Sequence, residues 1–142
     1  MSLLNLPEFE PRIREGEIFC LIRKKWVALL PEEWVRQHFL NLLTQHLNYP
    51  KGMIQLEHSM QYFKNQKRSD ITILDKEGRV FMLVECKSYK VKLTQKTVNQ
   101  VSEYSKVLDA AYIAISNGLR HFIWVRREDG FEQEKDFPRY EN

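Results

Sequence analysis

The stretch RSDITILDKEGRVFMLVECK, residues 68–87, decides the fold of this chain. Two apolar runs, residues 71–74 and 80–84, flank the polar segment DKEG at residues 75–78. β-Branched and aromatic residues on either side of a short polar loop with a glycine are typical of a β-hairpin. The sequence therefore predicts two antiparallel strands joined by a turn at residues 75–78.

Three charged residues stand at the open end of this predicted hairpin: Asp70, Glu85 and Lys87. Side chains two residues apart on a strand point to the same face, so Glu85 and Lys87 share a face and Cys86 points to the other. A hairpin folded about its central turn brings Asp70 roughly opposite Glu85 and Lys87. Two carboxylates placed together repel each other unless a cation lies between them. Oxygen ligands with no His or Cys on the same face suit Mg²⁺ or Mn²⁺.

Hydrolysis of a phosphodiester is the chemistry that uses such a set of groups. A divalent ion neutralises charge on the phosphoryl oxygens and lowers the pKa of a bound water. Lys87 can orient that water or stabilise the developing charge. The alternative is that Glu85 and Lys87 form a surface ion pair that contributes little. Two features favour a metal site over a surface ion pair: Asp70 lies opposite these residues, and the strand that they end is apolar. Charged residues at the end of a buried strand are costly unless they have partners or a function.

The composition is that of an ordinary globular domain with a core of its own. The chain has 142 residues, of which 43% are hydrophobic and 29% charged, and its formal charge of +3 is too small to indicate a nucleic-acid partner by itself. Cys20 and Cys86 lie in apolar surroundings and predict reduced core thiols of a cytoplasmic protein. The four histidines have no zinc-binding spacing. No apolar run approaches membrane-spanning length, so we expect no contact with a membrane.

Helical and strand periodicities alternate along the chain and predict an α/β fold with a central sheet flanked by helices. We expect an arm with short strands over residues 1–30, a core over 31–130 and a tail over 131–142, within one domain. The predicted helices cover residues 31–47 and 94–110, and the predicted strands cover 54–63, 71–74, 80–84, 112–115 and 121–125, with a final edge strand near 131–137.

The first predicted helix carries two further candidates. Val35, Phe39 and Leu43 form its apolar stripe, and Glu33 lies on the shoulder of that stripe, where a carboxylate could face a cleft at the sheet edge. Glu33 could equally be a partner of the helix N-terminal dipole. Arg36 lies near the same side and could contact phosphate or pair with a nearby glutamate.

Other polar residues could position a phosphate or face the site. Lys67 and Arg68 belong to a basic loop that leads into Asp70, and Lys90 lies in the connection after the hairpin; each could instead belong to a solvated turn. Gln100 and Tyr104 are four residues apart on the second predicted helix, so they share a face. That face could point towards the site, or the two residues could form a pair on the protein surface.

The order of these motifs resembles the PD-(D/E)XK nuclease superfamily, and more narrowly the nuclease domain at the N-terminus of the motor (R) subunit of type I restriction enzymes. The matching segments are PEEWVRQ at residues 31–37, RSDI at 68–71, VECK at 84–87, QVSEY at 100–104 and ISNG at 115–118. The resemblance implies a restriction-endonuclease-like core, a central mixed β-sheet flanked by helices in the order αβββαβ.

The resemblance also implies a metal-dependent DNA endonuclease. Asp70 and Glu85 would bind Mg²⁺ (or Mn²⁺), and Lys87 would activate or orient the water. Gln100 and Tyr104 match the family's helix motif beside the site, and Glu33 matches its acidic position on the first helix. DNA is the implied partner, with a homodimer or a larger restriction or repair complex as further expectations.

Two other functions remain open at this point. A nuclease fold could grip DNA or a protein partner without cutting, although the intact Asp70, Glu85 and Lys87 set argues against decay of the site. A purely structural or oligomer-forming protein would need no metal at all.

Overall fold

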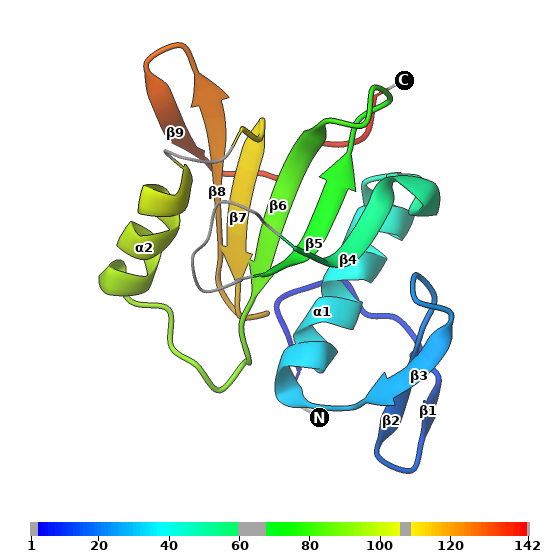
Figure 1. Cartoon of the computed structure of the whole chain (residues 1–142). Coiled ribbons are helices and arrows are strands. Elements are labelled where there is room, and N and C mark those ends of the chain that lie inside the picture. The colour runs from blue at the N-terminus through cyan, green and yellow to red at the C-terminus, as the bar shows by residue number, and fades with distance from the viewer. Residues whose placement is uncertain (1–2, 60–67, 106–108, 142) are drawn as a thin grey trace.

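The computed structural model describes residues 3–59, 68–105 and 109–141, apart from the side chains of 57–59, 68, 69, 102, 104 and 105. A six-stranded sheet with the strand order β4-β5-β6-β7-β8-β9 forms its centre (Figure 1). The elements are β1 (Ile13–Arg14), β2 (Glu17–Cys20), β3 (Lys25–Ala28), α1 (Pro31–Asn41), β4 (Ile54–Ser59), β5 (Arg68–Leu74), β6 (Val80–Cys86), α2 (Gln95–Ser105), β7 (Tyr112–Ser116), β8 (His121–Arg127) and β9 (Gly130–Glu134). The predicted α/β class and mixed central sheet are confirmed.

The hairpin that decides the fold is β5 and β6. Ile71 pairs with Val84 and Ile73 with Met82, in antiparallel register. Its turn is closed by the carboxylate of Asp75, which accepts hydrogen bonds from the backbone N–H groups of residues 77 and 79 at 2.9 and 2.8 Å. Continuing the register past Ile71 brings residue 70 opposite residue 85, as the sequence predicts.

The connection from β6 to β7 joins two neighbouring strands that run in the same direction. β6 and β7 run parallel, whereas the other neighbouring pairs in this sheet are antiparallel. Parallel neighbours need a crossover, and α2 supplies it. Thr94 precedes the helix, and its hydroxyl accepts a bond from the N–H of Thr97 at 3.4 Å. Val101 of α2 packs with Leu83 and Ile113 on this face of the sheet.

The opposite face of the sheet is covered by α1. Val35, Phe39 and Leu43 are completely buried, which confirms the predicted apolar stripe. The helix is shorter than predicted, because regular α-helical bonding ends at Asn41 and a π-helical turn follows (Leu42–His46). There the hydroxyl of Thr44 donates to the Leu40 carbonyl at 2.8 Å and competes with the regular backbone bond.

The N-terminal segment forms a sheet of its own from β1, β2 and β3. The sequence predicts an arm with short strands here but does not locate β1, because its two residues are too few to give a periodic signal. Ile18 and Cys20 are buried on one face of this small sheet, and Cys20 joins the main core. In Figure 1 the small sheet lies near the start of α1 and apart from the six-stranded sheet.

The remaining predictions on the fold are met in part. Cys20 and Cys86 are free and buried, as expected. The edge strand predicted near the C-terminus is β9, paired with β8. β4 ends at Ser59 and α2 at Ser105, so the predicted continuations at residues 60–63 and 106–108 lie outside the described residues. Residues 109 and 110, which the sequence predicts as the end of the second helix, are not helical. In the ranges that the structure describes, neither helix is long and apolar enough to cross a membrane.

Candidate functional site at the open end of the β5–β6 hairpin

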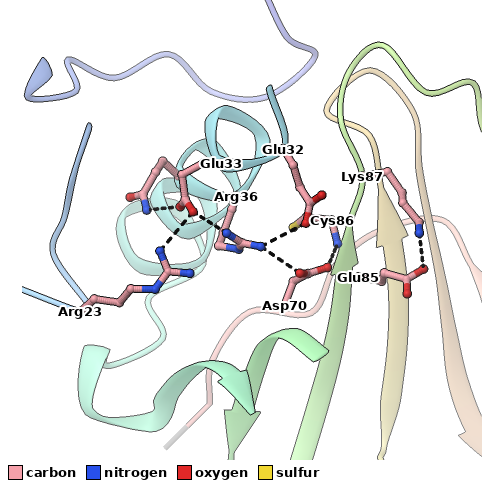
Figure 2. A network of polar contacts seen from close by, with 9 residues as sticks. Arg23, Glu32, Glu33, Arg36, Asp70, Glu85, Cys86 and Lys87 are labelled. Atoms are coloured by element: carbon pink, nitrogen blue, oxygen red, sulfur yellow. Dashed lines mark hydrogen bonds and ion pairs between the residues drawn. The ribbon is translucent and has the colours of Figure 1, made fainter. Parts of the chain in front are cut away.

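The three charged residues of the hairpin gather at one end of the sheet, beside the first turns of α1 (Figure 2). Asp70 Oδ2 accepts the backbone N–H of Cys86 at 2.7 Å, which ties the start of β5 to the end of β6. Lys87 Nζ lies 3.7 Å from Glu85 Oε2. Cys86 packs in the core with α1, so its side chain leaves the face that Glu85 and Lys87 share. All three residues thus lie at one end of the sheet, with Asp70 turned towards Arg36 of α1 and Glu85 turned towards Lys87 (Figure 2).

Both oxygens of the Asp70 carboxylate are engaged. Arg36 Nη2 donates to Oδ1 at 2.9 Å, while the Cys86 N–H donates to Oδ2. Burial raises the pKa of Asp70, and the charge of Glu85 raises it further. The Arg36 guanidinium and the Cys86 N–H lower the pKa, but they do not cancel the effect of burial. The negative charge of Glu85 therefore lies close enough to disfavour ionisation of Asp70.

Arg36 occupies the centre of a buried network. Its Nη1 donates to Glu33 Oε1 in a short contact, and its Nη2 reaches Glu32 Oε1 at 3.2 Å as well as Asp70. Burial opposes the charge on Arg36, but Glu33 and Asp70 outweigh it and raise its pKa. Of the two roles that the sequence allows, pairing with acidic neighbours is the one seen.

Glu33 lies on the far side of Arg36 from the hairpin. Its Oε1 accepts Arg23 Nη1 at 3.1 Å, and its Oε2 accepts Gln37 Nε2 at 2.8 Å. The structure thus places Glu33 in the same network as Asp70 but separates the two carboxylates by a guanidinium.

Glu32 and Arg23 belong to this cluster and were not among the residues predicted from the sequence. Burial raises the pKa of Glu32, and the charge of Asp70 is the next largest cause. The only signal for Glu32 in the sequence is that it stands in the first turn of a helix, where acidic residues are common. Arg23 has no signal, since it follows a short strand and pairs with a residue of a different element.

The other predicted residues lie apart from the cluster or outside the described part of the chain. Gln100 is exposed on α2 and Lys90 is exposed in the connection that leads to it. Neither makes a polar contact with Asp70, Glu85 or Lys87 in the described ranges. Lys67 lies outside the described residues, as do the side chains of Arg68 and Tyr104.

Binding of a divalent ion at this end of the sheet would depend on two carboxylates, those of Asp70 and Glu85. Among the described side chains, no three His, Cys, Asp or Glu residues are grouped as a metal-binding cluster. Mg²⁺ in proteins usually keeps several waters and binds one or two carboxylates together with substrate phosphate. Asp70 and Glu85 each offer a carboxylate at this end of the sheet, and the charge of Glu85 adds to the burial that raises the pKa of Asp70. The residues present therefore fit Mg²⁺ or Mn²⁺ held partly by water.

The sequence matches the model of a known protein family. The family model described as "Type I restriction enzyme R protein N terminus (HSDR_N)" matches residues 31–138, which is most of the chain. No curated protein matches the sequence. The matched region begins with α1, contains Asp70, Glu85 and Lys87, and leaves the N-terminal sheet outside.

Proposed function

Because the chain belongs to the family of type I restriction enzyme R protein N termini, we propose that it is a metal-dependent DNA endonuclease of the restriction or DNA-processing type. The observation that supports this most is the meeting of Asp70, Glu85 and Lys87 at one end of the sheet, inside the matched region. The family supports a restriction-related nuclease; metal dependence and the roles of individual residues are our proposal.

Asp70 and Glu85 would hold Mg²⁺ (or Mn²⁺) through one carboxylate each. When bound, the ion would supply a water of lowered pKa and charge neutralisation at the phosphate. Lys87 Nζ lies beside Glu85, where its positive charge can hold the attacking water or offset charge on the phosphoryl oxygens.

Arg36 and the Cys86 backbone position the Asp70 carboxylate. With one oxygen held by the N–H of residue 86 and the other by Arg36, the carboxylate has a fixed orientation before any ligand arrives. Each carboxylate oxygen still has a second lone pair for a further ligand. Fixed orientation favours catalysis because the reacting groups need no rearrangement.

DNA is the proposed substrate, and the protein would act in the cytoplasm, alone, as a homodimer or within a larger restriction complex. Lys67, Arg68 and Lys90 remain proposals for phosphate contacts. Gln100 remains a proposal for a catalytic residue, and Tyr104 for a contact with the nucleic acid. For Glu33 we propose a positioning role, through Arg36, on the orientation of Asp70.

A plasmid-cleavage assay with Mg²⁺ or Mn²⁺, and with chelator as the blank, tests the proposal. Asp70→Asn, Glu85→Gln and Lys87→Met should each lower the cleavage rate by at least about a hundredfold. Arg79→Gln, an exposed change at the other end of the hairpin, should cleave like the wild type. Full activity of Glu85→Gln would refute the assignment.

A second candidate is a domain that binds DNA without cutting it. The pairing of Arg36 with Asp70 favours this alternative, because the guanidinium already neutralises the carboxylate. It would be supported by DNA binding in chelator together with the absence of cleavage in either metal.

A further inference from the structure

The outer face of the N-terminal sheet carries two arginines stacked on an aromatic pair. Phe19 of β2 pairs across the sheet with Trp26 of β3, and the two rings meet edge to face with centroids 5.4 Å apart. The Arg12 guanidinium lies 4.5 Å from the Phe19 centroid and 5.5 Å from that of Trp26, and the Arg14 guanidinium lies 4.3 Å from Trp26. Cation–π contacts of this kind hold both guanidiniums against the sheet.

These two guanidiniums have few anions to balance them. Arg14 pairs with Glu17 at 2.8 Å, but both side chains are well exposed, at 56% and 38%, so the pair is screened and readily exchanged. Within the part of the chain that the structure describes, no carboxylate pairs with Arg12. Two like charges over one indole repel each other, and an anion bound to both would relieve that repulsion. Guanidinium donors in a planar fork match the oxygens of a phosphate.

The segment around these residues is basic. Residues 11–28 contain five cations (Arg12, Arg14, Arg23, Lys24 and Lys25) and two anions (Glu15 and Glu17), and of the cations Arg23 and Lys25 line the cavity beside α1. A local excess of positive charge attracts a polyanion. The half-buried rings add an aromatic surface that can contact a nucleic acid of any base sequence. A nucleic acid therefore fits this face better than an acidic or apolar protein surface of defined shape.

The small sheet is also tied to the candidate site. Arg23, which follows β2, bonds Glu33 of α1; Glu33 bonds Arg36, and Arg36 bonds Asp70 (Figure 2). Lys25 of β3 and Glu32 of α1 line the same cavity of about 320 Å³ between the sheet and the helix. The side of the N-terminal sheet that carries Arg23 and Lys25 thus adjoins the helix that holds Arg36.

We propose that the Arg12–Arg14 face of the N-terminal sheet binds the phosphodiester backbone of DNA outside the cut position. The choice of DNA rests on the proposed function. The matched family region begins only at residue 31, so this surface lies in the part of the chain that the family model does not cover.

Binding of a short fluorescein-labelled duplex, measured by anisotropy in chelator over a series of salt concentrations, tests this surface without cleavage. The double variant Arg12→Gln/Arg14→Gln should bind at least about tenfold more weakly, and the slope of log Kd against log salt should fall by about 1.8, or about 0.9 for each phosphate that is no longer neutralised. The matched control is Arg79→Gln/Arg127→Gln, which removes two exposed, ion-paired arginines elsewhere and should bind like the wild type.

Unchanged affinity in the Arg12/Arg14 variant, or an equal decrease in both double variants, would overturn the inference, since the effect would then be absent or due to net charge alone. A wild type that binds no duplex would overturn it as well. The failure of the proposed function is a separate result: full cleavage by Glu85→Gln would refute the catalytic site while selectively weaker binding of the Arg12/Arg14 variant still supported this surface.

Discussion

Arg36 Nη2 lies 2.9 Å from Asp70 Oδ1 and donates to it across 34 positions of sequence. The same nitrogen also reaches Glu32, and the neighbouring Nη1 reaches Glu33. One guanidinium therefore joins the first turn of α1 to the start of β5. A divalent ion that binds Asp70 would share the carboxylate with Arg36, so the arginine can affect both the stability of the fold and metal affinity.

Removing the Arg36 guanidinium should destabilise the protein strongly. Arg36→Met leaves Glu33 buried, with Arg23 as its remaining cationic partner in the described part of the chain, and loss of one partner of a buried pair costs about 3–5 kcal/mol. Arg79→Met removes an exposed pair and should cost less than about 1 kcal/mol. Urea unfolding followed by circular dichroism measures both; similar losses of stability in the two variants would contradict the importance of the network.

The sequence predicts those parts of the fold that are determined by residues close together in the chain. The turn at Asp75 and the apolar runs beside it define the β5–β6 hairpin, and Pro31 with the stripe through Phe39 defines α1. The π-helical turn after Asn41 depends on the bond from Thr44 to Leu40, a competition between nearly equal backbone geometries that periodicity does not resolve.

The candidate site also has a part that the sequence predicts and a part that it does not. The placement of Asp70 near Glu85 follows from hairpin register, which the sequence contains. The partners of Arg36 do not follow from any spacing, because the bonds to Asp70 and from Arg23 to Glu33 depend on how separate elements pack. Gln100 is exposed in the structure, and helical periodicity alone could not decide between a surface position and one facing the site.

Substitution of Gly118 should be costly because of its surroundings as well as its backbone. Gly118 has φ +86°, and an added Cβ would lie 2.9 Å from Leu4 Cδ2 and 3.1 Å from Val35 Cγ2. Gly78, with φ +79°, has open space at the same position. Gly78→Ala should cost about 1 kcal/mol from strain alone, and Gly118→Ala a further 1–3 kcal/mol or so from overpacking. Equal unfolding free energies for the two variants would disprove this packing.

The contribution of His121 to stability should fall in mild acid. Burial lowers its pKa, while the bond to the Asn5 carbonyl opposes this; Nε2 donates to that carbonyl at 2.8 Å, and Nδ1 accepts the Ser116 hydroxyl at 2.7 Å. The unfolded chain therefore takes up the proton first. The contribution is complete above the unfolded pKa near 6.5 and is lost as the pH falls towards the lower folded pKa.

Comparison of the wild type with His121→Gln isolates this effect from other titrating groups. The difference in unfolding free energy between the two proteins should shrink as the pH falls from about 7.5 through the unfolded pKa near 6.5. A difference that stays constant with pH would show that the ring is protonated equally easily in both states.

Divalent ions should stabilise the native protein through the hairpin carboxylates. At a concentration of Mn²⁺ about a hundredfold above its Kd, the unfolding free energy should rise by about 2.7 kcal/mol. Asp70→Asn and Glu85→Gln should each abolish most of this increase, whereas Glu77→Gln, an exposed change in the hairpin turn, should retain it. An equal increase in all three variants would locate the ion elsewhere on the protein.

A crystal of the wild-type protein grown with Mn²⁺ and examined by anomalous scattering tests the central claim most directly. The account predicts one ion within about 2.0–2.3 Å of an oxygen from Asp70 and an oxygen from Glu85, with Lys87 beside it and water filling the other positions. An ion bound away from these two carboxylates, with Asp70 still held only by Arg36 and the Cys86 N–H, would contradict it.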